Sequence, residues 1–147
     1  MLDFEAAKRV ARDRWLSAFD DEPGGPQVIH DAECVEYEWG WLIEWGPSRP
    51  DLVPPDEAQW GQLPVLVDRV TGHLEMVSTA GPRLAIMQLL ERRPPEVRSP
   101  DVSAEELGGL TRVRVSMRAF TPLSELRSGE PESSKAVEVF RLPHRDR

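Results

Sequence analysis

Residues 35–45, with the sequence VEYEWGWLIEW, constrain the fold more than any other stretch of the chain. Apolar and polar residues that alternate with a period of two are typical of a β-strand with one buried face. The run therefore predicts one long strand over residues 35–45. Its opposite face would carry the carboxylates of Glu36, Glu38 and Glu44. Its apolar face would be formed by Val35, Tyr37, Trp39, Trp41, Ile43 and Trp45.

Two helices are predicted, one on each side of this run in the sequence. Apolar residues at helical spacing predict a helix over residues 3–19, with Asp3 as its N-cap. A second helix is predicted over residues 82–92, because Pro82 suits the first turn of a helix and Pro94-Pro95 would end it.

Further strands are predicted later in the chain. Residues 64–69 and 73–78 alternate and are joined by a turn at Gly72, which predicts an antiparallel hairpin. Two more strands are predicted, over residues 111–120 and 136–142. Residues 94–109 are expected to form a linker with room for one helical turn.

These elements predict an α+β protein. We expect a mostly antiparallel, twisted sheet of about five strands, with both helices packed on one face. A chain of 147 residues fits a single domain. Within it, residues 1–93 would form the core, and residues 94–147 would be an extension that adds strands to the same domain.

Charge and cysteine content limit the partners and the location. With 26 acidic and 18 basic residues, the formal charge of −8 repels nucleic acid and anionic lipid, so neither is expected as a partner. Cys34 is the single cysteine, which is typical of a reducing compartment. The first residues form an amphipathic helix pattern without the apolar core of a signal peptide. We therefore expect a cytoplasmic protein.

Several short motifs follow one another in a distinctive order over residues 4–92. They are a helix, a strand with Gly40-Trp41, a loop, the segment PVLVD from Pro64 to Asp68, the turn Thr71-Gly72, the segment Ser-Thr-Ala from Ser78 to Ala80, and a second helix. This order resembles the immunity protein 35 family, also called the YrhB-like domain, of bacterial polymorphic-toxin systems. The residues after Pro95 have no counterpart in the resemblance.

The resemblance implies a protein that binds a cognate protein toxin. Such a protein neutralises the toxin in a stoichiometric complex by occluding its active or substrate-binding surface. The resemblance implies neither enzymatic activity nor a cofactor. A non-immunity accessory or chaperone-like binding protein of a biosynthetic or secretion gene cluster stays open as the alternative.

The glutamates of the predicted strand are the first candidate binding surface. Complementary charge speeds the encounter with a basic partner and favours correct pairing. Alternatively, these glutamates lie on a solvated sheet face and pair with arginines of a neighbouring strand, which would remove most of their attraction for a partner. The arginines concerned are Arg112, Arg114 and Arg118.

The Pro-rich loop of residues 46–63 is the second candidate binding surface. Exposed tryptophans are common interface hot spots. Trp45, just before the loop, and Trp60, within it, are the tryptophans that we expect to be exposed. Charged residues accompany them: Arg49, Asp51, Asp56 and Glu57.

Residues capable of catalysis are few. Cys34 with His30 or His73 as a base could act as a nucleophile, but a lone cysteine beside a strand is typical of a small buried hydrophobic residue. The sequence contains no CxxC or HxxxH pair, which are spacings that would indicate a metal site. Asp68 and Thr71 are expected to cap N–H groups of a tight turn. We therefore predict no catalytic residue and no metal ligand.

Overall fold

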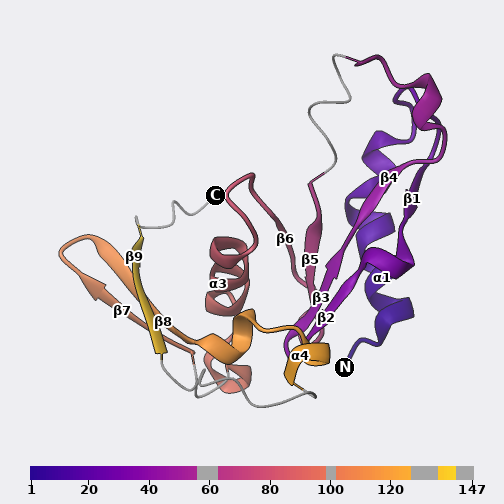
Figure 1. Cartoon of the computed structure of the whole chain (residues 1–147). Coiled ribbons are helices and arrows are strands. Elements are labelled where there is room, and N and C mark those ends of the chain that lie inside the picture. Colours follow the sequence, from indigo (N-terminus) through magenta and orange to yellow (C-terminus); the bar gives the residue numbers. More distant parts are fainter. Residues whose placement is uncertain (56–62, 99–101, 127–135, 142–147) are drawn as a thin grey trace.

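A computed structural model describes residues 1–55, 63–98, 102–126 and 136–141 of the chain. These residues form an α+β fold, as expected, but with nine strands in three sheets instead of about five strands in one sheet. A helix, a sheet, a second helix and a second sheet follow one another in layers (Figure 1). The helices that were predicted are α1 (Phe4–Arg14), continued by a 3-10 helix (Leu16–Phe19), and α3 (Arg83–Glu91).

Three antiparallel sheets contain the strands. The first has the order β2-β3-β5-β6, formed by Val35–Tyr37, Gly40–Ile43, Val65–Asp68 and Leu74–Met76. A two-stranded ribbon contains β1 (Gln27–Ile29) and β4 (Trp45–Pro47). The second large sheet has the order β7-β8-β9, formed by Val102–Leu107, Leu110–Ser116 and Ala136–Arg141. A short helix, α4 (Leu123–Leu126), lies near β2.

The prediction of one long strand over residues 35–45 is wrong, because the run folds into a hairpin followed by a break. A two-residue turn at Glu38 and Trp39 reverses the chain between β2 and β3. A Cβ added to Gly40 would lie 2.0 Å from the carbonyl oxygen of Val67 on β5. Glycine at this position therefore lets β3 and β5 approach closely enough to pair.

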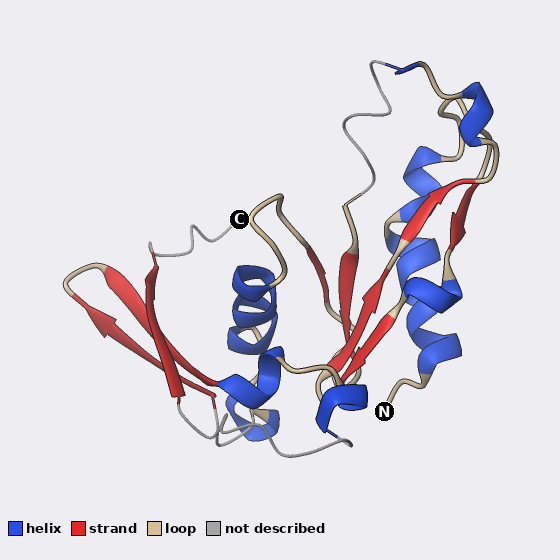
Figure 2. Ribbon diagram, in the orientation of Figure 1, coloured by secondary structure: helices blue, strands red, loops and turns tan. Residues whose placement is uncertain are grey.

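The hairpin also changes which side chains share a face. Because Glu36 pairs with Trp41, odd positions before the turn lie on the same face as even positions after it. Trp41 and Ile43 pack with α1, whereas Tyr37 and Leu42 pack with α3. The expectation that both helices cover one face is therefore wrong. The central strands β3 and β5 are buried on both faces of the first sheet, with α1 on one face and α3 on the other (Figure 2).

The segment expected to be a linker, residues 94–109, holds a helical turn (Pro95–Val97), as expected, but it also contains strand β7, which was not predicted. Gly108 and Gly109 form the turn between β7 and β8, with φ of 53° and 85°. Positive φ at both positions is what a type I′ hairpin turn requires. The extension forms a sheet of its own, and its Val113 and Val115 are buried in the same cluster as residues of α3.

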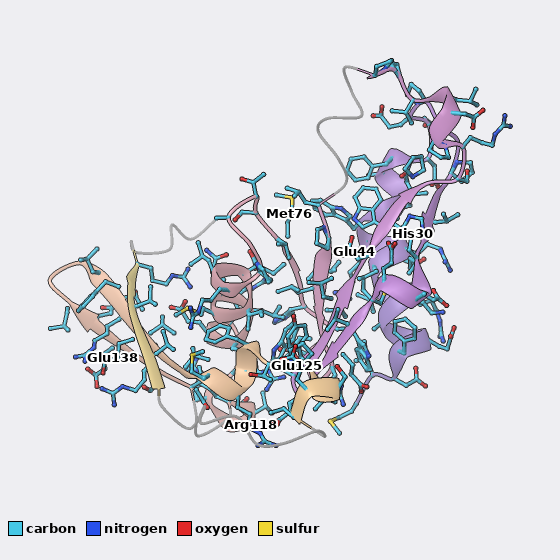
Figure 3. All side chains as sticks on the ribbon, in the orientation of Figure 1. His30, Glu44, Met76, Arg118, Glu125 and Glu138 are labelled. Atoms are coloured by element: carbon cyan, nitrogen blue, oxygen red, sulfur yellow. The ribbon has the colours of Figure 1, made fainter. Side chains whose placement is uncertain are left out.

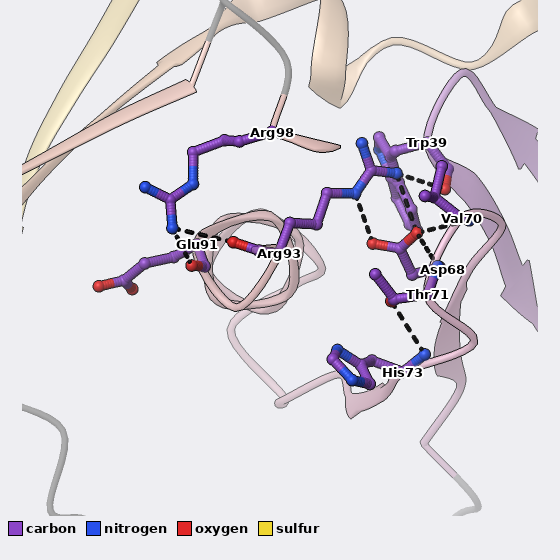
Figure 4. A network of polar contacts seen from close by, with 8 residues as sticks. All are labelled: Trp39, Asp68, Val70, Thr71, His73, Glu91, Arg93 and Arg98. Carbon is purple, nitrogen blue, oxygen red and sulfur yellow. Dashed lines mark hydrogen bonds and ion pairs between the residues drawn. The ribbon is translucent and has the colours of Figure 1, made fainter. Parts of the chain in front are cut away.

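Asp68, at the end of β5, is fully buried and has its polar contacts satisfied. One carboxylate oxygen accepts the N–H groups of Val70 and Thr71 at 2.8 and 3.2 Å, which confirms the predicted cap. The Thr71 hydroxyl accepts the N–H of His73 at 3.2 Å. Arg93, just after α3, donates to both carboxylate oxygens at 2.7 and 2.9 Å (Figure 4). This ion pair joins the β5–β6 turn to the end of α3.

Candidate protein-binding site

An open cleft of about 520 Å³ lies between the start of α1 and the first sheet. We call it the N-terminal cleft. Three of its residues are carboxylates, and the segments that contribute to it lie far apart in the sequence. The lining residues are Met1, Leu2, Asp3, Phe4, Asp31, Cys34, Glu36, Trp41 and Arg69.

Arg69, directly after β5, connects several walls of the cleft. Its Nη2 donates to Oε2 of Glu36 at 2.9 Å and to the carbonyl oxygen of Tyr37 at 2.8 Å. Its guanidinium carbon lies 4.5 Å from the centre of the Trp41 ring. Its own carbonyl oxygen accepts the N–H of Leu2 at 2.8 Å. Arg69 therefore fixes Glu36 and Trp41 in place beside the N-terminal segment.

Lys8 shows how this part of the molecule holds a cation. Its Nζ lies 2.8 Å from Oε1 of Glu5, 2.9 Å from Oδ2 of Asp31, and 4.7 Å from the centre of the Phe4 ring. Glu5 and then Asp31 raise the pKa of Lys8 above its usual value. The Phe4 ring also contacts Trp41, with 6.2 Å between the ring centres. Carboxylates and aromatic rings thus occur together at the cleft.

Cys34 lines the cleft as a protonated thiol. Burial raises its pKa, and its sulfur lies 3.4 Å from the carbonyl oxygen of His30, to which the thiol donates. A thiol is a weak nucleophile compared with a thiolate, so this environment does not activate Cys34. Within the described part of the chain, no group of three His, Cys, Asp or Glu side chains is placed to hold a metal ion.

The three glutamates predicted to share one strand face are separated in the structure. Glu36 lines the N-terminal cleft, and Glu38 lies in the turn between β2 and β3. Glu44 lies between β3 and β4, beside His30 (Figure 3). The prediction of a single acidic row is therefore wrong, because the turn and the break after Ile43 divide it.

The arginines suggested as partners of that row make different contacts. Arg118 binds Glu38, as the alternative interpretation expected. Arg112 and Arg114 bind Glu138 on β9 instead, within the second large sheet. The pairing of the whole row with these arginines is therefore wrong: Arg118 offsets the charge of Glu38, whereas Glu36 is paired with Arg69.

The loop predicted as the second binding surface is only partly described. Trp45 is 5% exposed and donates from Nε1 to the carbonyl oxygen of Leu63 at 2.9 Å, so the prediction that it is exposed is wrong. Its ring packs 5.1 Å from that of Phe19. Arg49 is exposed and pairs with exposed Asp51 at 3.3 Å, a contact of small energetic value. Asp56, Glu57 and Trp60 lie outside the described residues.

Sequence reasoning did not identify Asp31 or Arg69 as residues of a binding surface. Asp31 lies in a 3-10 helix (Asp31–Glu33) between β1 and β2. No sequence pattern marks Arg69 as a binding residue, because its contacts with Glu36 and Trp41 exist only once β3 and β5 are paired. Neither residue belongs to a local motif that could have identified it.

Glu44→Gln is expected to raise the free energy of unfolding at neutral pH by less than about 1 kcal/mol, because the group is largely solvated. Burial and then Glu33 raise the pKa of Glu44. A carboxyl whose pKa is raised on folding binds protons more tightly when folded, so stability falls as pH rises from the unfolded pKa through the folded pKa. Urea unfolding of the wild type and the variant near pH 3.5 and pH 7 measures the difference in their free energies of unfolding. Equal or lower stability of the variant at pH 7 would contradict the assignment.

No protein-family model, no curated protein and no solved structure matches this chain. Among the helices that the structure describes, none is both long and apolar enough to cross a bilayer.

Proposed function

We propose that the chain is a cytoplasmic immunity protein, which binds a cognate bacterial toxin in a stoichiometric complex and covers the toxin's active or substrate-binding surface. The observation that supports this proposal most directly is the N-terminal cleft, where Asp3, Asp31 and Glu36 accompany the rings of Phe4 and Trp41. The order of motifs over residues 4–92, which resembles that of the immunity protein 35 family, supports a toxin as the partner.

A lysine or arginine side chain of the toxin suits the chemistry of the cleft. Carboxylates accept charged hydrogen bonds, and aromatic rings attract a cation over their faces. Lys8 provides an example within the chain, since it binds Asp31 and lies over Phe4. The formal charge of −8 adds long-range attraction for a basic toxin surface.

Replacing two carboxylates of the cleft, in the double variant Asp31→Asn and Glu36→Gln, is expected to weaken toxin binding about 10- to 100-fold. Each substitution keeps the shape of the side chain but removes a charged acceptor. Titration calorimetry with the purified toxin measures the change.

The matched control is the double variant Asp20→Asn and Glu22→Gln. It changes the net charge by the same amount at exposed residues outside the cleft. We expect its affinity to stay within about threefold of the wild type. Equal affinities of the two double variants would show that the cleft does not contact the toxin.

The accessory or chaperone-like alternative would use the same surface with a different partner. A partner that is harmless when expressed alone, and that comes from a biosynthetic or secretion gene cluster, would favour it. A partner that stops cell growth favours immunity.

A further inference from the structure

Strand β7 forms an open edge of the second large sheet. It lies at one end of the order β7-β8-β9, and no strand in the described residues pairs with its outer side. Residues 103–107 are all exposed, because α3 packs against the end of the strand that contains buried Val102. The hairpin of β7 and β8 projects away from the rest of the molecule (Figure 1). An edge of this kind can pair with a strand of another chain.

The register identifies which backbone groups of β7 point outward. Leu107 pairs with Leu110 across the two-residue turn, so these two exchange hydrogen bonds. Hydrogen-bonded pairs then alternate with non-bonded pairs along the ladder. Ala104 and Glu106 are in non-bonded positions, so their N–H and C=O groups face the open edge. An added strand would find donors and acceptors there.

Two carboxylates that form no ion pair with any described residue lie in the middle of this edge. Glu105 is opposite Arg112 and attracts it electrostatically, but Arg112 and Arg114 form their ion pairs with Glu138 on the far strand. Within the described residues, neither Glu105 nor Glu106 makes an ion pair. Since neighbouring residues of a strand point to opposite faces, one carboxylate lies on each face of the sheet.

A second copy of the chain does not suit this edge. Antiparallel pairing of two β7 strands centred on Glu105 would place the two Glu105 carboxylates directly opposite each other, which destabilises a sheet. In a register centred on Ala104, the same carboxylates would be diagonal neighbours. The charges therefore favour a different protein with basic residues.

We propose that β7 pairs, edge to edge, with an extended segment of a second protein that carries two adjacent basic residues, one for each face. The backbone of Ala104 and Glu106 would supply the hydrogen bonds, and Glu105 and Glu106 would select the basic pair. This surface is separate from the N-terminal cleft, and the partner need not be a toxin.

The test uses the full chain labelled with nitrogen-15 and, as the probe, the end-blocked peptide Val-Thr-Lys-Arg-Thr-Val. We expect saturable shifts of the amide signals of Val102–Leu107, together with slower hydrogen exchange at Ala104 and Glu106. A peptide with Glu-Asp in place of Lys-Arg should bind at least about tenfold more weakly. The cleft variant with Asp31→Asn and Glu36→Gln should bind the basic peptide like the wild type.

Two substitutions at one position separate backbone pairing from loss of fold. Ala104→Pro removes an outward N–H without removing a bond to β8, and proline is tolerated on strand edges. We expect it to weaken binding of the basic peptide about tenfold. Ala104→Val keeps the N–H, and its affinity should stay within about twofold. Both variants should unfold at urea concentrations close to that of the wild type.

The proposal would be overturned by the absence of a saturable response at β7, by equal affinity for the two peptides, or by unchanged binding in a folded Ala104→Pro variant. A dimer formed through β7, detected by sedimentation, would also overturn it. If neither a peptide nor a second copy pairs with β7, Glu105 and Glu106 are charges that keep an edge strand from pairing.

Discussion

Arg93→Met is expected to lower the free energy of unfolding by about 3–5 kcal/mol, because it leaves a buried carboxylate without its cation. Asp68 is 0% exposed, and Arg93 donates to both of its oxygens. Arg93 also donates to the carbonyl oxygen of Trp39 at 3.2 Å, so the substitution removes one of the two hydrogen bonds to that oxygen, which still accepts the N–H of Arg69 at 2.8 Å. Equilibrium unfolding in urea measures the loss.

The neighbouring residue provides the control. Arg92 binds Glu75 at 3.1 Å, but its side chain is 42% exposed, so Arg92→Met should cost less than about 1 kcal/mol. Adding Asp68→Asn to Arg93→Met should recover part of the loss, because the amide that replaces the carboxylate is neutral. If Arg93→Met costs no more than Arg92→Met, the buried pair does not join α3 to the β5–β6 turn as the structure indicates.

Gly40→Ala is expected to destabilise the protein by about 3 kcal/mol or more, through overlap of atoms in the sheet. The new Cβ would lie 2.0 Å from the carbonyl oxygen of Val67, well inside contact distance. β3 and β5 would have to separate at this point, which weakens the pairing of Trp41 with Val67. Urea unfolding measures the loss, and near-ultraviolet circular dichroism should show a changed environment of the tryptophans.

Gly108→Ala is the matched control for this prediction. Gly108 also has a positive φ, of 53°, but no atom lies within 4 Å of an added Cβ. Only the conformational cost of about 1–2 kcal/mol applies there. Equal losses for the two substitutions would mean that Gly40 is needed for its backbone conformation and not for the close approach of β5.

Elements set by local sequence were predictable. Asp3 caps α1 by accepting the N–H of Ala6 at 2.8 Å, as the sequence indicates. The hairpin of β5 and β6 with Gly72 at a φ of 72° agrees with the prediction, since turn chemistry and alternation act over neighbouring residues. α3 begins one residue after Pro82.

The break in residues 35–45 was not predictable from alternation alone. The turn residues Glu38 and Trp39 are not typical of hairpin turns, and large apolar residues continue through the turn. After the turn, even-numbered residues lie on the face that odd-numbered residues occupy before it. Large apolar side chains therefore point to both faces of the sheet. Gly40 was the available signal, because a glycine inside a strand pattern often marks a bulge or a close backbone approach.

Strand β7 and the N-terminal cleft escaped prediction for different reasons. β7 is exposed along most of its length, so it shows no alternation, and its one local signal was the Gly108-Gly109 turn. The cleft depends on contacts between distant residues. Glu36 was identified as a binding residue, but Asp31 and Arg69 join it only through the tertiary fold.

Growth of cells that express the partner tests toxin neutralisation most directly. Capture of the native protein from its own cells, followed by mass spectrometry, identifies a partner that co-purifies in near-equal amount. That partner is then expressed in a bacterial host, alone and with each variant of this chain. We expect the partner to stop growth when it is expressed alone. The wild-type chain and the Asp20→Asn, Glu22→Gln control should both restore growth. The Asp31→Asn, Glu36→Gln variant should restore growth poorly. A partner that does not impair growth on its own would contradict the proposed function.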